Sequence, residues 1–166
     1  MNQTADAWIK AFKMEKHPEG GYYKPVYKSG LDVQVKGQET RAAYTSIYFL
    51  LGSRDVSRFH KLTADEIWYY HAGAPLTVHM IDPNGCYETA KLGLNLEQGE
   101  QPQLLVPAGI IFGATPDERH PEADFALVSC MVAPGFEFSD FTLFDRKDLL
   151  AIYPQHEGIV RRLTRP

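Results

Sequence analysis

The chain has 166 residues, with 17 basic and 21 acidic side chains, so its formal net charge is −4. Apolar residues make up 44% and charged residues 23% of the sequence, which is close to the globular average and excludes fibrous and disordered classes. The one basic cluster, Arg161, Arg162 and Arg165, stands at the C-terminus, where we expect a solvated tail. No other feature predicts a nucleic-acid partner.

Hydrophobic runs are short. The longest, Ile47 to Leu51 and Leu149 to Tyr153, fall far below the roughly 20 residues of a membrane span. Lysines interrupt the N-terminal segment, which therefore lacks the apolar region of a signal peptide. We predict a cytoplasmic protein with no membrane partner. Cys86 and Cys130 form no CxxC motif and are expected to be reduced thiols without a chemical role.

The chain begins with a helical pattern and then changes texture. Apolar residues recur at helical spacing behind Thr4, which can cap a helix, so residues 1–16 are expected to hold a short amphipathic helix. After Gly20 and Gly21, turn formers recur every 8 to 15 residues and β-branched and aromatic residues fill the intervals. The predicted strands are Ala42 to Leu51, Glu66 to His71, Leu76 to Asp82, Tyr87 to Leu92, Gln103 to Val106, Ile110 to Ala114 and Phe125 to Val132.

Turn and helix signals complete the outline. Residues 83–85, Pro-Asn-Gly, predict a hairpin turn. Asp145 to Ile152 predicts a second helix, which ends before Pro154 and is followed by the tail. Short strands with helices only at the ends favour an all-β sandwich or barrel over a βαβ fold. We expect a single domain over residues 1–166, with the barrel in 20–144 and the second helix and tail in 145–166.

Side chains alternate between the two faces of a strand, so a barrel strand has an inward and an outward set. Ser46, Tyr48 and Leu50 share one face of their strand. If Glu66 points inward, Trp68 does as well, and so does Tyr70. A barrel interior with such polar groups predicts a bound ligand or ordered water, because unsatisfied buried polar groups cost about 1 to 3 kcal/mol each.

The segment 52–73 resembles the first motif of the cupin superfamily. His60 stands at the first histidine position, Glu66 at the glutamate position, and Gly73 follows after six intervening residues. Gly99 followed by Pro-Ala-Gly at residues 107–109 resembles the second cupin motif.

Four further strings are similar to one branch, the largely uncharacterised fifth cupin domain family, which resembles RmlC-like sugar epimerases. They are residues 17–23 (HPEGGYY), 65–68 (DEIW), 106–109 (VPAG) and 133–138 (APGFEF). The resemblance runs from about His17 to Phe144. It implies a small jelly-roll barrel (a double-stranded β-helix), a homodimer, and a ligand pocket between the two sheets.

The sequence departs from the cupin pattern at two metal positions. Leu62 stands in place of the second histidine of the first motif, and Phe112 in place of the histidine of the second. Transition metals need about three protein ligands even in open sites, and Gln103 would be a poor one. We predict no metal or other cofactor; if an ion bound, His60 and Glu66 would be its candidate ligands.

The resemblance to metal-free epimerases implies a proton-transfer site. In that site His60 abstracts a proton, Glu66 orients the imidazole, and Tyr48 or Tyr70 returns a proton from the opposite side. The predicted ligand-binding residues are Ser46, Tyr48, His60, Glu66, Trp68, Gln103, Phe112 and Phe136.

Three functions remain open at this point. The first is an epimerase or isomerase for a carbohydrate-like substrate, the second a non-catalytic metabolite-binding cupin, and the third a metal-dependent oxygenase or isomerase completed by other ligands. The partner is expected to be a small polar metabolite, and an anionic one if Arg54, Arg58 and Lys61 rim the opening. The glycines at 20 and 21 either supply a turn into the first strand or form a loop over the pocket mouth.

Overall fold

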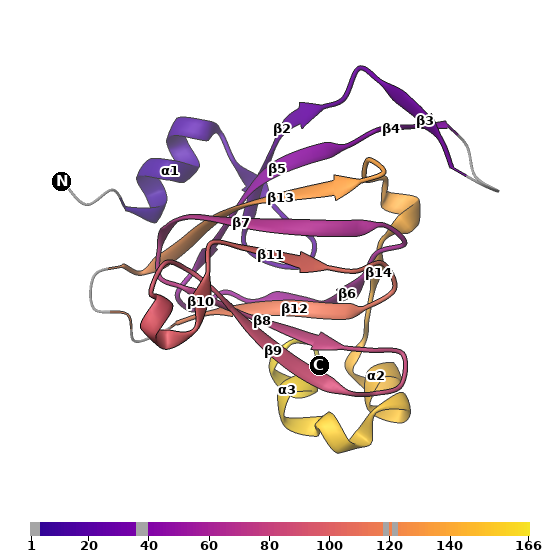
Figure 1. Ribbon diagram of the computed structural model, residues 1–166. Helices are drawn as coiled ribbons and strands as arrows, with labels where there is room; N and C mark the ends of the chain where they lie inside the picture. Colours follow the sequence, from indigo (N-terminus) through magenta and orange to yellow (C-terminus); the bar gives the residue numbers. More distant parts are fainter. Residues whose placement is uncertain (1–3, 36–39, 118–119, 121–122) are drawn as a thin grey trace.

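The computed structural model describes residues 4–35, 40–117, 120 and 123–166 (Figure 1). Its helices and short helical turns are α1 (Ala5–Phe12), η1 (Leu96–Gln98), η2 (Phe138–Asp140), α2 (Arg146–Ile152), η3 (Pro154–His156) and α3 (Glu157–Arg162). Its strands are β1 (Glu15–Lys16), β2 (Tyr22–Lys28), β3 (Asp32–Gln34), β4 (Thr40–Ala42), β5 (Thr45–Gly52), β6 (Ser57–Lys61), β7 (Asp65–Gly73), β8 (Leu76–Ile81), β9 (Tyr87–Leu92), β10 (Glu100–Gln101), β11 (Gln103–Val106), β12 (Ile111–Pro116), β13 (Phe125–Ala133) and β14 (Thr142–Leu143).

Within the described residues, two six-stranded sheets form the barrel. One has the order β1-β2-β5-β13-β7-β11 and the other β10-β9-β8-β12-β6-β14. The long strands pair antiparallel, and β13 lies between β5 and β7, which come much earlier in the chain. A late strand that pairs between two much earlier strands is typical of a jelly roll and not of a simple meander. The all-β jelly-roll prediction is confirmed, and Asn84 lies in the predicted hairpin between β8 and β9.

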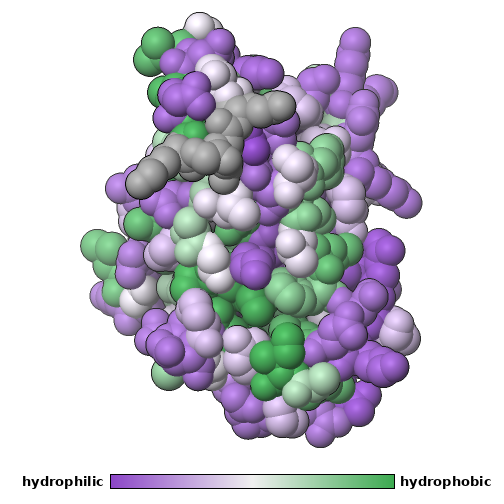
Figure 2. Space-filling model, turned by 90° about the vertical axis from the view of Figure 1, so that its right-hand side faces the viewer, coloured by the Kyte–Doolittle hydropathy of each residue, from purple (hydrophilic) through white to green (hydrophobic). Residues whose placement is uncertain are grey.

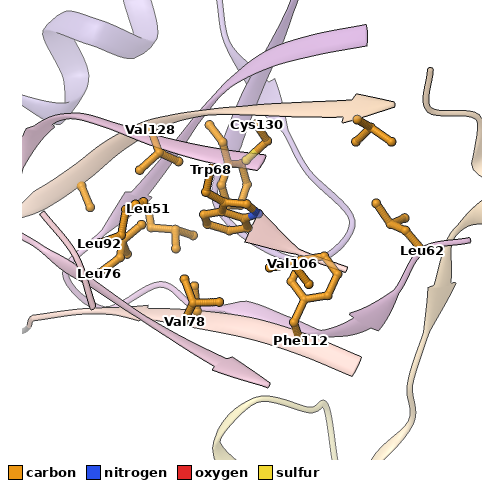
Figure 3. Close-up of a cluster of buried hydrophobic side chains, with 14 of the residues drawn as sticks. Leu51, Leu62, Trp68, Leu76, Val78, Leu92, Val106, Phe112, Val128 and Cys130 are labelled. Carbon is orange, nitrogen blue, oxygen red and sulfur yellow. The ribbon is translucent and has the colours of Figure 1, made fainter. Parts of the chain in front are cut away.

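The core lies between the sheets and receives side chains from both. Trp68 of β7 is 1% exposed and stands in its middle. Leu51, Leu76 and Leu92 lie on one side of the indole, and Leu62 lies on the other (Figure 3). Burying each of these large apolar side chains stabilises the fold by about 1.5 to 3 kcal/mol.

The outer face of the first sheet is covered by α1. Thr4 caps this helix, because its Oγ1 accepts a hydrogen bond of 3.3 Å from the backbone N–H of Ala7. Trp8 stacks on Phe12, and Phe12 packs on the outward-facing Tyr48. The predicted N-terminal helix is thus confirmed. No helix in the described part of the chain is long and apolar enough to cross a membrane.

The C-terminal segment is folded, which corrects the prediction of a solvated tail. The predicted second helix is present as α2, and α3 follows it. Val160 and Leu163 are fully buried and pack with Phe59 of β6 against the outer face of the second sheet. Since α3 is short and contains Gly158, its helical periodicity is weak in the sequence.

Two of the strands with five or more residues, β2 and β6, were not predicted, nor were the short β1, β3, β4, β10 and β14. β2 contains Pro25, and β6 carries Arg58 and Lys61 among its five residues. Proline and charged residues are depleted in strands, so neither segment has a clear strand signal. The basic residues expected on a loop before the Glu66 strand therefore lie partly on β6, which also positions His60.

Candidate functional site

A cavity of about 340 Å³ opens between the two sheets, where β2, β5, β6, β7 and β13 run past residues 136–141. Its aromatic lining consists of Tyr23, Tyr27, Phe49, Phe136, Phe138 and Phe141. Polar side chains at its buried end are His17, Glu19, His60, Glu66 and Cys130. Figure 2 views the side of the molecule on which β13 ends, and hydrophobic residues gather near the middle of that face. The cavity is therefore an aromatic-walled hollow with an ionisable floor.

Glu19 reaches this floor through the loop between β1 and β2. Gly20 has a φ of 127° and Gly21 one of 65°, both in the region that favours glycine. A Cβ at Gly20 would lie 2.0 Å from the carbonyl oxygen of Val56. The loop is pinned to β6, because the backbone N–H of Arg58 donates to the carbonyl of Glu19 at 2.9 Å. The glycines thus supply the turn, one of the two roles left open by the sequence.

Glu19 contacts His60 at the floor. Oε2 of Glu19 lies 3.2 Å from Nε2 of His60, and Oε1 accepts a hydrogen bond of 2.8 Å from Ser57 Oγ. Nδ1 of His60 lies 2.7 Å from the carbonyl oxygen of Arg58. Because a carbonyl oxygen can only accept, Nδ1 carries the hydrogen, and the neutral ring presents a lone pair on Nε2 to Glu19.

His17 lies beside the same carboxyl group. Its Nδ1 accepts the backbone N–H of Glu19 at 3.3 Å and lies 3.5 Å from Oε2. An ionised carboxylate facing the Nε2 lone pair of His60 would be repelled, so a proton must lie between Glu19 and His60. Burial raises the pKa of Glu19 and lowers the pKa of His60 to about 4. Both effects place the proton on Glu19, which donates it to Nε2.

Glu66 of β7 is the other carboxyl group of the floor. It is 6% exposed, and its Oε2 atom makes no hydrogen bond with any described residue. Burial and then the nearby Glu19 raise its pKa to about 8, whereas a hydrogen bond with the Cys130 thiol and the nearby Trp68 indole favour the charged form. The indole nitrogen has no hydrogen bond of ordinary geometry. At neutral pH, Glu66 is therefore mostly a neutral acid with an unpaired oxygen in the hollow.

The structure brings some predicted site residues together. Ser46, His60, Glu66 and Phe136 all line the cavity. The expectation that Glu66 orients His60 is wrong, because the carboxyl group in contact with the imidazole belongs to Glu19. Sequence reasoning missed Glu19; the Gly-Gly pair after it was the available signal that the chain turns sharply at this point.

Three predicted residues lie away from the cavity. Tyr48 faces outward, with its ring 4.8 Å from that of Phe12. Tyr70 is on the inward face but lies beyond Trp68, and its hydroxyl donates to the carbonyl of Gly73 at 2.5 Å. Gln103 is exposed on the edge strand β11. The structure therefore does not bring Tyr48, Tyr70 or Gln103 to this cavity.

Two aromatic residues predicted to bind ligand are core residues instead. Trp68 packs edge-on against Phe49, with ring centroids 5.8 Å apart. Phe112 is 1% exposed and supports His60, with ring centroids 4.1 Å apart. Both fill space behind the cavity wall, and neither is among its lining residues.

The expected basic rim is not formed at this cavity. Arg54 and Lys61 are absent from its lining, and Nη1 of Arg58 donates to the carbonyl of Glu19 at 2.9 Å. Among the lining residues that the structure describes, the basic side chain is the exposed Lys28.

The side chains present do not fit a transition metal. Across residues 4–35, 40–117, 120 and 123–166, no group of three or more His, Cys, Asp or Glu side chains is arranged to hold an ion. Leu62 and Phe112 are buried apolar residues where a metallo-cupin has histidines, which leaves only His60 and Glu66 of the four motif positions. The absence of a metal or other cofactor stays a prediction, and no step below uses one.

Two sheets that enclose a hollow, with a histidine and a glutamate at the positions of the first motif, define a cupin barrel. Comparison with known families gives the particular branch. The family described as "Cupin superfamily (DUF985)" matches residues 6–144, and the chain belongs to this family.

Several proteins are similar to this chain in sequence, and two of them also in structure. An uncharacterized protein of Saccharomyces cerevisiae is 30% identical over 155 residues, which cover 86% of this chain and 76% of the yeast protein. A crystal structure of a Shewanella oneidensis protein is 50% identical, with a TM-score of 0.89 and 99% of both chains covered. A hypothetical protein from Leishmania major is 39% identical, with a TM-score of 0.92 over 99% of this chain and 100% of that one.

A more distant likeness shows the fold alone. Oxalate decarboxylase of Bacillus subtilis is 15% identical, with a TM-score of 0.56 over 89% of this chain and 36% of that one.

Proposed function

We propose that the protein binds a small, carbohydrate-like metabolite in the barrel cavity and moves a proton on it, as a metal-independent isomerase or epimerase. The observation that carries this proposal is the unpaired Oε2 atom of Glu66, which is buried at the cavity. A buried acceptor or donor without a partner costs about 1 to 3 kcal/mol, which a bound ligand would recover. The volume of about 340 Å³ lies at the small end of ligand pockets.

Glu66 is the group that we assign to proton exchange. A general acid or base works best when its pKa lies near the operating pH, and the pKa of Glu66 is raised to about 8. In an epimerisation its carboxylate form takes a proton from the carbon beside the substrate carbonyl. A proton from water is delivered to the opposite side of that carbon, and Glu66 releases to solvent the proton that it took, so no bond is left broken and no oxidant is needed.

We assign the Glu19–His60 pair to holding a second proton, near the one that Glu66 exchanges. Glu19 lies near Glu66 at the buried end of the cavity, and its own proton lies toward His60. It is placed to protonate the carbonyl oxygen of the substrate while Glu66 removes the carbon-bound proton. His60 then takes a positioning role, because both of its ring nitrogens already have partners.

Occupation of both His60 nitrogens also supports a second candidate, a metabolite-binding protein without catalysis. In that case Glu66 only hydrogen-bonds the ligand. The homodimer implied by the family resemblance and the cytoplasmic location remain part of the proposal under either candidate.

Ligand screening followed by isotope exchange tests the proposal. Neutral sugars and amino sugars, with sugar phosphates and small carboxylates as anionic comparisons, are added in thermal-shift assays to the wild type, Glu66→Gln and Glu88→Gln, the last an exposed control on β9. A ligand at about 100 times its Kd stabilises the wild type by about 2.7 kcal/mol. We expect the Glu66→Gln variant to lose most of this effect and the Glu88→Gln variant to keep it.

Hits are then incubated in deuterium oxide. Label in the carbon skeleton with the wild type, lost in Glu66→Gln, is the expected result for an isomerase. Binding without label selects the non-catalytic candidate. Shifts that are equal in all three proteins contradict the assignment of the site.

A further inference from the structure

The charges around the cavity restrict the chemistry of its ligand. Two carboxyl groups, Glu19 and Glu66, stand at its buried end, and the basic lining residue among those described, Lys28, is exposed at its outer end. Burial lowers the pKa of both His17 and His60, so the imidazoles are neutral near pH 7. The floor therefore offers no cation to a carboxylate or phosphate group.

The walls favour a ligand with positive charge. Tyr23 and Phe49 lie opposite each other on β2 and β5, and Phe136 and Phe141 contribute two more rings, with centroids 6.3 Å apart. Aromatic faces attract organic cations within about 6 Å, most strongly where water is excluded. Ring faces and carboxyl groups together are the two partners that an ammonium group uses in proteins.

We propose that the buried end of the ligand is a protonated amine whose N–H groups donate to Oε2 of Glu66 while its carbon frame packs on the aromatic walls. This inference rests on the proposed function and narrows its substrate to amine-bearing compounds, such as amino sugars. When the ammonium group binds, Glu66 releases its carboxyl proton to solvent. The carboxylate and the ammonium group then form a neutral ion pair, and the released proton carries the positive charge that the ligand brought. A neutral ligand would instead accept a hydrogen bond from the intact acid.

The groups facing Glu66 are consistent with this chemistry. The Cys130 thiol hydrogen-bonds to it from β13, and the side chains of Glu19 and His17 approach from the β1–β2 loop and that of His60 from β6. Within the described lining, none of these four brings a positive charge at neutral pH, and no partner reaches Oε2. An ammonium group would supply the missing partner and the missing charge together.

Three probes of equal frame and different charge test the inference: benzylamine, benzyl alcohol and benzoate. Their binding is measured by calorimetry at pH 6, 7 and 8 to the wild type, Glu66→Gln and Glu88→Gln. We expect benzylamine to bind the wild type at least tenfold more tightly than benzyl alcohol at pH 7, and benzoate to bind most weakly. The affinity for benzylamine should rise about tenfold per pH unit toward pH 8. The binding enthalpy should also differ between buffers of different ionisation enthalpy, because binding releases a proton.

The variants separate charge from shape. Glu66→Gln should bind benzylamine at least tenfold more weakly than the wild type does. Its affinity for benzyl alcohol should be unchanged, which shows that the cavity of this variant is intact. Glu88→Gln should behave as the wild type. If benzyl alcohol binds as tightly as benzylamine and depends equally on Glu66, the amine is wrong while the ligand site stands. Binding of none of the three probes to the wild type contradicts both proposals.

Discussion

The two halves of the barrel interior are filled in opposite ways. On one side of Trp68, side chains such as Leu51, Leu76 and Leu92 are at most 1% exposed and pack into a dry core (Figure 3). On the other side, the same sheets leave a hollow of about 340 Å³ whose floor carries Glu19 and other ionisable groups.

A single strand serves both halves. β7 contributes Trp68 to the dry core and Glu66, two residues earlier, to the hollow. A close-packed interior supplies most of the free energy of unfolding of a domain. The dry half therefore offsets the cost of a buried acid whose Oε2 has no hydrogen-bond partner in the other half. The comparison predicts that mutations in the dry half change stability most, whereas mutations around the hollow change protonation and binding.

The largest effect is expected from a matched pair of leucines. Leu51→Ala in the dry core should lower the free energy of unfolding by about 2 to 5 kcal/mol, because the removed atoms leave a new void. Leu62 is equally buried but lines the existing cavity, so Leu62→Ala loses fewer packing contacts and should cost at least about 1 kcal/mol less. Urea unfolding of both variants measures the difference, and equal losses would contradict the division of the interior.

A smaller effect is expected where the loop carrying Glu19 turns. In Gly20→Ala the new Cβ would meet the carbonyl oxygen of Val56 at 2.0 Å, at a φ of 127°. The loop must shift, and we expect a loss of about 1 to 3 kcal/mol together with loss of the ligand-induced thermal shift. Gly30→Ala is the control, because a Cβ there meets nothing within 4 Å. A Gly20→Ala protein that binds ligand normally would show that the position of Glu19 does not matter.

The sequence was sufficient for the barrel and for half of the site. Turn residues and strand alternation located most long strands, and motif spacing located His60 and Glu66, because these signals depend on residues close together in the chain. Contact between Glu19 and His60 depends on how a distant loop packs on β6, and no local pattern encodes it.

Alternation alone also could not say which face of a strand is inside. The Tyr48 face of β5 also carries apolar side chains, because α1 covers it, and the wrong face was chosen for Tyr48. For Tyr70 the face was correct, but Trp68 fills the interior between it and the cavity.

The effect most specific to the hollow is a pH-dependent difference in stability between the wild type and Glu66→Gln. The pKa of Glu66 is raised from its ordinary value of 4.5 to about 8 in the folded protein. Its contribution to stability is therefore fully present below pH 4.5 and is lost as the pH rises through 8. Glutamine does not titrate, so the variant should gain on the wild type by about 1.4 kcal/mol per pH unit between these limits.

Urea unfolding at pH 5, 6, 7 and 8 measures this difference, with Glu88→Gln as the exposed control. Glu88 serves as the control because it is exposed on β9 and does not line the hollow. A constant difference between Glu66→Gln and the wild type would mean that Glu66 is ionised in the folded protein. The floor would then already hold a charge with a partner, and a ligand would have no unpaired acid to meet.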